Sequence, residues 1–211
     1  MILPHGTRLI APLREGWVQT GDIRHDVPTF LTAHGLPETA AHVGNVAKVA
    51  KQLAARFGED AAQTEAETAA WLHDISVVFP NETRIMAAES FGLTVLPEER
   101  AYPMIVHQRL SAVLARELFH VRDPTTLSAI ACHITLKAGA TRLDTIVFIA
   151  DKIAWDQPGV PPHLPALTDA LEHSLDAAAF VHLDWLWQQR ETLRVIHPWF
   201  REAYLERALQ A

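Results

Sequence analysis

The sequence is short of cysteine, of positive charge and of long apolar runs. Its single cysteine, Cys132, rules out a disulfide within the chain, which suits a reducing compartment, so we expect a cytoplasmic protein. Lysine and arginine number 18 against 25 aspartates and glutamates, and the net charge of −7 argues against a nucleic-acid-binding protein with a basic surface. No apolar run approaches about 18 residues, and no charged segment precedes an apolar one at the N-terminus. We therefore expect neither a membrane span nor a signal peptide.

Repeats, low-complexity tracts and Gly/Ser linkers are also missing, and the 211 residues have an ordinary globular composition with 49% hydrophobic and 20% charged residues. From Pro37 onward apolar residues recur with the 3.6-residue period of a helix, and strand signals are scarce. The predicted fold is therefore all-α in a single domain. Its expected parts are an irregular or short-helix N-terminal extension (1–36), a core (37–160) and C-terminal helices packed on the core (161–211).

Six helices are expected in the core and three after it. Pro37 suits a first helical turn, Gly58 a C-terminal cap, and Asp123 an N-cap before Pro124. The core helices are placed at 37–57, 61–73, 82–91, from about 103, from 124, and around 143–153, and the closing helices at 166–178, 180–196 and 198–209.

Histidine is the unusual residue, with 12 copies, and several lie on apolar helix faces. His42 borders the apolar stripe of the first strong helix, and His107 lies within the stripe of the fourth. Each could be an ordinary core histidine, and His133, at the end of "LSAIACH", could simply complement a helix dipole. Asp151 interrupts the apolar helix "TIVFIADKIAW", where aspartate has poor propensity and a buried salt bridge is its ordinary explanation.

The segment "WLHDISVV" places His73 and Asp74 side by side among apolar residues. A buried, unpaired carboxylate is costly, so the pair either lies exposed at a helix end or binds a metal ion. One shared explanation covers all these polar residues: they meet around metal inside a helical bundle. Imidazole and carboxylate groups suit iron, manganese, cobalt or zinc. In chain order the six residues are His42, His73, Asp74, His107, His133 and Asp151.

This order, together with "AHVGNVAKVAKQLAARFGED", "AAWLHDIS", "VHQRLSAVLARELF", "LSAIACHIT" and "IVFIADKIAWDQPGV", resembles the HD-domain metal-dependent phosphohydrolases. Within them it is most similar to the YqeK-type symmetrical diadenosine tetraphosphate hydrolases. The resemblance covers about residues 37–160. It implies an HD-domain helical bundle with the metal site at its centre.

The resemblance also assigns ligands to two divalent ions. It implies one ion held by His42, His73, Asp74 and Asp151, and a second held by His107 and His133, with Asp74 bridging the two. Iron is the first choice, then manganese, cobalt or zinc. Such a pair activates a water and clamps a phosphoryl oxygen. The implied reaction is symmetrical hydrolysis of diadenosine tetraphosphate to two ADP.

Three cations are candidates for contacts with the substrate phosphates. Lys152 follows a ligand and is expected, with Asp74, to act in catalysis, although it could also be an ordinary surface lysine. Lys137 and Arg142, in "TLKAGATR", could form a phosphate-binding lip or be plain surface charges; Arg84 and Arg109 rank below them.

The sequence departs from the family pattern at three places. Thr39 stands where an arginine is frequent, "HDISVVF" has no lysine after the HD pair, and "AWDQPG" replaces a segment that usually holds Glu and Arg. Alternatives therefore stay open: another phosphate ester such as a nucleoside monophosphate, or a non-catalytic nucleotide-binding module. Cys132 beside His133 has no nucleophile context, and we expect it to be a small buried residue.

The expected partner is a small-molecule nucleotide, with neither nucleic acid nor a membrane. The C-terminal helices carry Trp185, Trp187 and Trp199. Aromatic residues at helical spacing usually pack in a core, but a homodimer face or an adenine-stacking wall is left open.

Overall fold

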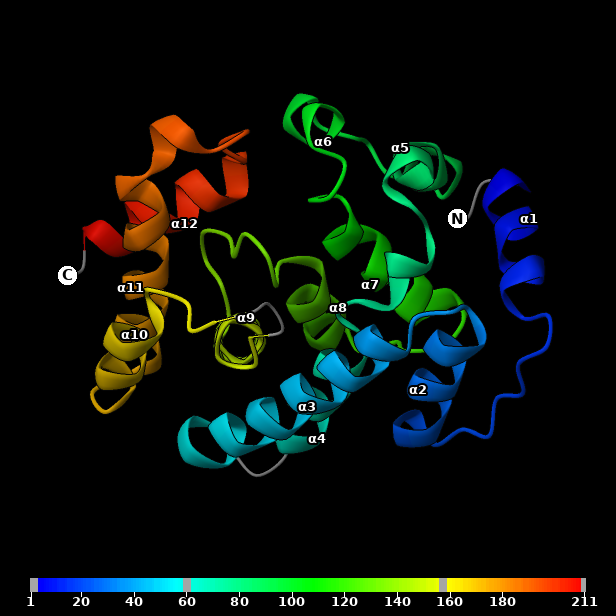
Figure 1. Ribbon diagram of the computed structural model, residues 1–211, viewed down its shortest axis with the longest axis horizontal. Helices are drawn as coiled ribbons and strands as arrows, with labels where there is room; N and C mark the ends of the chain where they lie inside the picture. Colours follow the sequence, from blue (N-terminus) through cyan, green and yellow to red (C-terminus); the bar gives the residue numbers. More distant parts are fainter. Residues whose placement is uncertain (1–3, 59–61, 156–158, 210–211) are drawn as a thin grey trace.

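The computed structural model describes residues 4–58, 62–155 and 159–209, and in these ranges it contains helices and connecting turns without any strand (Figure 1). The predicted all-α fold is confirmed. The elements are α1 (Pro4–Leu13), α2 (Ile23–Ala33), α3 (Pro37–Phe57), α4 (Ala62–Leu72), the 3-10 helix η1 (Ile75–Val78), α5 (Asn81–Ser90), α6 (Pro97–Ala101), α7 (His107–Glu117), α8 (Pro124–Ala131), α9 (Arg142–Ile153), α10 (Leu164–Leu171), α11 (Leu175–Gln188), the 3-10 helix η2 (Arg190–Thr192) and α12 (Pro198–Ala208).

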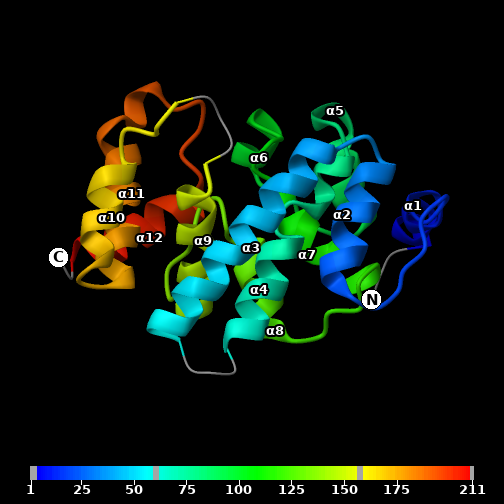
Figure 2. The same ribbon diagram turned by 60° about the horizontal axis from the view of Figure 1, so that its bottom comes forward.

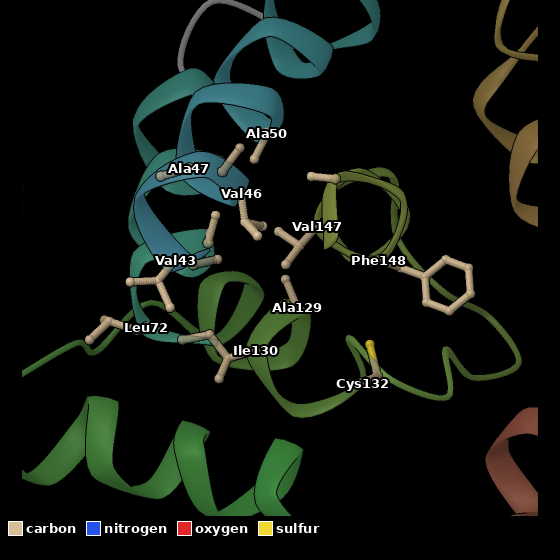
Figure 3. Packing of buried hydrophobic residues seen from close by; sticks show 14 of the residues in the cluster. Val43, Val46, Ala47, Ala50, Leu72, Ala129, Ile130, Cys132, Val147 and Phe148 are labelled. Carbon is tan, nitrogen blue, oxygen red and sulfur yellow. The ribbon is translucent and has the colours of Figure 1, made fainter. Parts of the chain in front are cut away.

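Helix α3 lies along the lower side of the molecule in Figure 1 and at the front in Figure 2. It packs against α2, α4 and α9, while α8 packs against α4, α7 and α9. The buried residues of α3 include Val43, Val46, Ala47 and Ala50, which are small or β-branched, and Val46 lies near Val147 of α9 (Figure 3). Small side chains allow helices to approach closely, so polar groups on neighbouring helices can come within a few ångströms of one another. This close packing sets the frame of the site.

Gly44 shows how close the contact between α3 and α4 is. A Cβ atom added at this position would lie 3.0 Å from the indole of Trp71, which is tighter than ordinary packing. Trp71 precedes the HD pair by two residues. The absence of a side chain at Gly44 therefore lets the end of α4 lie against the helix that carries His42.

The core helices begin and end close to their expected positions. The Asp123 side chain caps α8 by accepting a 2.7 Å hydrogen bond from the Thr126 amide, as the sequence predicts. Cys132 is fully buried, and burial raises the pKa of its thiol, which agrees with the expected structural role. In contrast, the fourth core helix begins at His107 and not near Pro103, because residues 103–106 form turns.

The N-terminal segment, expected to be irregular or to form a short helix, contains two helices. Residues 14–22 connect α1 to α2, and Asp22 caps α2 by accepting a hydrogen bond from the Arg24 amide. Phe30 and Leu31 of α2 are fully buried in the core. The turn formers "PHG" and "HDVP" suggested loops at these positions, but Pro28 lies inside α2 without ending the helix.

The boundaries of two closing helices differ from the prediction. The break between the two helices lies at residues 172–174 and not near 179. The Ser174 hydroxyl caps α11 there by accepting a hydrogen bond from the Ala177 amide. The short helix α6 was not expected. Trp187 and Trp199 of this region are partly buried against the core, and Trp187 stacks on Tyr204 with ring centroids 4.5 Å apart. Among the described residues, no helix combines the length and the apolar character needed to cross a bilayer.

Candidate metal centre

Five separate segments deliver the six predicted ligands to one place. His42 lies in α3, His73 and Asp74 form the turn between α4 and η1, and His107 is the first residue of α7. The other two are His133, in the turn after α8, and Asp151, in the last turn of α9. Because α4 ends at Leu72, the adjacent residues His73 and Asp74 lie in a turn and can both face one cluster. Two neighbours in a turn can converge, whereas in a helix they point about 100° apart.

One half of the cluster consists of His42, His73 and Asp151. The Asp151 Oδ1 atom lies 3.2 Å from His42 Nε2 and 3.6 Å from His73 Nε2. Together these three side chains have the spacing of a metal site. His73 is fully buried, whereas the Asp151 side chain retains 12% of its surface, so this half opens at its carboxylate.

Asp74 joins this half to a second one. Its Oδ2 atom lies 3.5 Å from His73 Nε2 and 3.9 Å from His42 Nε2. Its Oδ1 atom lies 3.0 Å from His107 Nε2 and 3.5 Å from His133 Nε2. One carboxylate oxygen therefore faces each half. A second triple with metal-site spacing, His73, Asp74 and His133, overlaps the first at His73.

Three of the histidines are oriented by the backbone directly before them. The Nδ1 atoms of His73, His107 and His133 lie 2.6, 2.5 and 2.9 Å from the carbonyl oxygens of Ala70, Met104 and Ile130, each three residues earlier in the chain. A carbonyl oxygen only accepts, so each Nδ1 carries a hydrogen. The neutral ring then has its lone pair on Nε2, which points into the cluster. Metal-ligating histidines are held in this way.

The Nε2 atoms fit a cation better than they fit one another. His107 Nε2 and His133 Nε2 lie 3.0 Å apart, although in the neutral rings neither can donate to the other. The buried Nε2 of His73 and Oδ1 of Asp74 accept no hydrogen bond at all. A set of converging, unsatisfied nitrogen and oxygen donors is what a borderline divalent metal ion requires. The residues therefore fit the predicted metal site.

The protonation equilibria of these groups are strongly coupled. Burial lowers the pKa of His73, but the negative charges of Asp74 and Asp151 outweigh it and raise this pKa to about 9. Burial dominates at His133 and lowers its pKa to about 4. Burial would raise the pKa of Asp74, yet the charge of His73 and the nearby imidazoles of His107 and His133 hold this pKa well below its ordinary value. The cluster thus carries ionised carboxylates that attract positive charge.

Lys152 contacts a ligand. Its Nζ atom donates to Asp151 Oδ2 at 2.6 Å and to the His133 carbonyl at 3.3 Å, and it lies 5.2 Å from the centre of the Phe148 ring. The lysine occupies one oxygen of Asp151 and leaves Oδ1 facing the histidines. In this structure Lys152 positions a ligand; the direct phosphate contact predicted from the sequence stays a prediction.

Lys137 and Arg142 are not brought to the cluster. Lys137 donates to Ser128 and lies 3.4 Å from Asp144, while Arg142 donates to the Phe57 carbonyl at 2.6 Å. Arg142 starts α9 and Asp151 lies nine residues further on, which is about 13 Å along a helix axis. Their phosphate-binding role stays a prediction that no contact in the structure supports.

The sequence reasoning missed two groups that hold the ligands in place. Ser76, two residues after Asp74, donates to the His107 carbonyl at 2.8 Å and accepts from the Ser111 hydroxyl at 3.0 Å, which ties η1 to α7. Gln108 accepts from the amides of Ile134 and Thr135 through Oε1 and donates to the Thr135 hydroxyl, which ties the turn after His133 to α7. Both residues lie within two positions of a predicted ligand, but the contacts that give them a role span 35 and 27 residues, which the local sequence pattern does not show.

Comparison with known proteins places these residues in a known pattern. The family model described as "HD domain" matches residues 39–156, more than half of the chain. An "Uncharacterized protein in pepC 5'region" from Lactococcus lactis subsp. cremoris is 46% identical over 141 residues, which is 67% of this chain and 71% of that protein. The "Bis(5'-nucleosyl)-tetraphosphatase, symmetrical" of Bacillus subtilis (strain 168) is 32% identical over 123 residues, or 56% of this chain and 63% of the relative.

A solved structure has the same fold. It is described as the crystal structure of a predicted HD superfamily hydrolase involved in NAD metabolism from Clostridium acetobutylicum. The TM-score is 0.80, over 93% of this chain and 100% of the other, at 22% sequence identity. This likeness covers more of the chain than the family match at residues 39–156, so the shared fold extends beyond that range.

Proposed function

The chain belongs to the HD domain family, and on that premise we propose that it is a metal-dependent phosphohydrolase that splits diadenosine tetraphosphate symmetrically into two ADP. The observation that carries the proposal is Asp74, which directs one oxygen to each half of a cluster of six side chains. A carboxylate in this position suits two ions. All six residues are present, which disfavours a non-catalytic nucleotide-binding module.

The chemistry follows from the properties of such a site. A bound pair of divalent ions supplies Lewis acidity toward a phosphoryl oxygen and brings the pKa of a coordinated water toward about 7. The protein itself fixes the imidazole Nε2 atoms through the carbonyls of Ala70, Met104 and Ile130. Asp74 and Asp151 provide the negative charge, and Lys152 keeps Asp151 in one orientation. No nucleophilic side chain is needed.

Electrostatics explain how an acidic protein could accept a polyphosphate. The chain has a net charge of −7 and would repel an anionic substrate at most of its surface. Two divalent cations exceed the charge of the two carboxylates in the cluster, so a loaded centre is locally positive. We favour iron, with manganese, cobalt or zinc as the alternatives that the nitrogen and oxygen donors also suit.

The substrate is supported by the resemblance and by the similarity to the symmetrical bis(5'-nucleosyl)-tetraphosphatase. The departures at Thr39 and after the HD pair favour a second candidate, another phosphate ester such as a nucleoside monophosphate. The other expectations stand as proposals: a small nucleotide as partner, neither nucleic acid nor membrane, a homodimer as an open option, and a cytoplasmic location.

The deciding experiment joins metal analysis of the purified protein to a product assay with diadenosine tetraphosphate. The expected result is about two transition-metal ions per chain and ADP as the only nucleotide product. ATP together with AMP would contradict symmetrical cleavage. Full metal content without turnover would reject this substrate, and a panel of nucleoside monophosphates then tests the second candidate.

A further inference from the structure

A pocket of about 360 Å³ lies beside the metal centre, between the segment before α7, the turn after His133 and the C-terminal segment around 186–200. Its volume is at the lower end of the range for small-molecule sites. The cavity is large enough for one nucleoside and too small for two. Nothing in the family match reaches the C-terminal wall of this pocket, because that match ends at residue 156.

The pocket shares two walls with the metal centre. Met104, on one wall, offers the carbonyl oxygen that orients His107. Thr135, on another wall, lies two residues after His133 and is held by Gln108. The segments 102–107 and 133–135 thus carry both cluster residues and residues that line the pocket.

The lining has the character of a site for a flat aromatic ring. Leu193 and Phe200 contribute apolar surface, and Tyr102 contributes a ring over which the Arg194 guanidinium lies at 5.1 Å from the centroid. Within the part of the chain that the structure describes, Arg194 has no carboxylate partner at ion-pair distance. An aromatic ring and an arginine plane are the surfaces on which nucleobases stack, and an unpaired guanidinium also attracts phosphate.

We propose that this pocket binds one nucleoside of the substrate, with its base against Tyr102 and Arg194, while the adjoining phosphates lie on the metal centre. The proposal rests on the proposed function and adds the substrate's recognition site to it. It uses Tyr102 and Arg194, and the tryptophans near the C-terminus do not line this cavity. Because the pocket holds one nucleoside, the second nucleoside of a dinucleotide lies outside it.

The test compares Tyr102→Ala and Arg194→Ala with the unmodified full chain. With diadenosine tetraphosphate, each variant is expected to raise KM about tenfold or more, on the scale of base stacking, with kcat changed less than about twofold. Tyr102→Phe, which keeps the ring, is expected to recover most of the lost affinity. Inorganic tripolyphosphate has no nucleoside, so its hydrolysis is expected to be the same in Tyr102→Ala and Tyr102→Phe as in the unmodified chain.

The matched control is Arg190→Ala. Arg190 lies over the ring of Trp187 at 5.3 Å, in the same C-terminal region but outside the pocket, so its loss is expected to leave KM unchanged. An equal rise in KM for Arg190→Ala and Tyr102→Ala would overturn the proposal.

Adenosine binding to the full chain in the presence of a chelator gives a readout that needs no turnover. We expect measurable binding by equilibrium dialysis that Tyr102→Ala weakens about tenfold. If adenosine does not bind, or binds equally to the variant, the pocket proposal fails even where hydrolysis is normal. If adenosine binds as expected but diadenosine tetraphosphate is not cleaved, the proposed substrate fails and the pocket remains.

Discussion

His107 Nε2 lies 3.0 Å from His133 Nε2, and both rings have their Nδ1 hydrogens committed to backbone carbonyls. Two lone pairs at this distance repel each other unless a cation or a proton lies near both. The same two nitrogens also lie 3.0 and 3.5 Å from Asp74 Oδ1. The region between His107 Nε2, His133 Nε2 and Asp74 Oδ1 therefore favours the binding of a cation.

This relationship predicts that divalent metal stabilises the protein. At a free metal concentration of about 100 times Kd, binding to the folded chain alone adds about 2.7 kcal/mol to the free energy of unfolding. Thermal unfolding with manganese or iron, and again with a chelator, measures the shift. An identical Tm in both conditions, with no metal found in the purified protein, would exclude the site.

Substitution of the two carboxylates is expected to have unequal effects. Asp74→Ala should reduce the metal content from about two ions per chain to almost none, because its two oxygens face both halves. Asp151→Ala should leave about one ion, since Asp151 faces only His42 and His73. Metal analysis of the two purified variants checks the difference. Full metal content in Asp74→Ala would refute the bridge.

Lys152 is expected to matter through Asp151. Removing the 2.6 Å contact in Lys152→Ala should lower metal affinity or kcat about 10- to 100-fold, the usual effect of losing a group that holds a ligand. Lys48→Ala, an exposed lysine of α3, is the control and should leave both unchanged. A rise in KM in Lys152→Ala, with kcat and metal affinity unchanged, would instead indicate a direct contact between Lys152 and a substrate phosphate.

Gln108→Ala is expected to destabilise the protein and the His133 turn together. The substitution removes the acceptor of two amides, that of Thr135, which is buried, and that of Ile134, which is half-buried. Each buried group without a partner costs about 1–3 kcal/mol. Urea unfolding measures the stability, with the exposed Gln52→Ala as control. Equal stability of both variants would show that the turn does not depend on Gln108.

The cap of α8 gives a prediction of pH dependence. Hydrogen bonds from Thr125 and Thr126 lower the pKa of Asp123 to about 2 from an ordinary value of 3.8. The folded state therefore favours the carboxylate, so the stabilisation is complete above about pH 4 and disappears as the pH falls toward 2. At pH 7, Asp123→Ala should cost about 1 kcal/mol, as N-cap losses do.

Urea unfolding of metal-free protein at pH 7 and at pH 3 measures this difference. The gap between the unmodified chain and Asp123→Ala should narrow at pH 3. Asp169→Ala, which changes an exposed aspartate of α10, provides the comparison. A gap that stays constant with pH would show that the charge of Asp123 does not contribute.

The sequence predicted the helical core and the members of the cluster for a simple physical reason. Core helices show a period, and polar residues such as Asp151 that interrupt it need a partner. Six such residues in the order of a known family left few other arrangements. The close approach of α3 and α4 at Gly44 could also have been suspected from a glycine within a helical stripe.

Other features depend on contacts that no local pattern encodes. Ser76 reaches Ser111 across 35 residues, and Gln108 reaches Thr135 across 27, so their roles appear only once the chain is folded. Lys137 was assigned by its position after a ligand, but it turns toward Asp144. The break at Ser174 depends on one hydroxyl that could equally have lain on a helix surface.

Three imidazoles in this chain take their orientation from carbonyl groups only three residues away. The orientation of these three rings is therefore fixed by the local backbone and does not require a bound ion. A chain emptied by a chelator should keep its donors in place and reload without refolding. The rate of metal exchange would then depend on the side of the cluster that carries the carboxylates. There the Asp74 side chain is 19% and the Asp151 side chain 12% exposed, so an ion can enter from solvent.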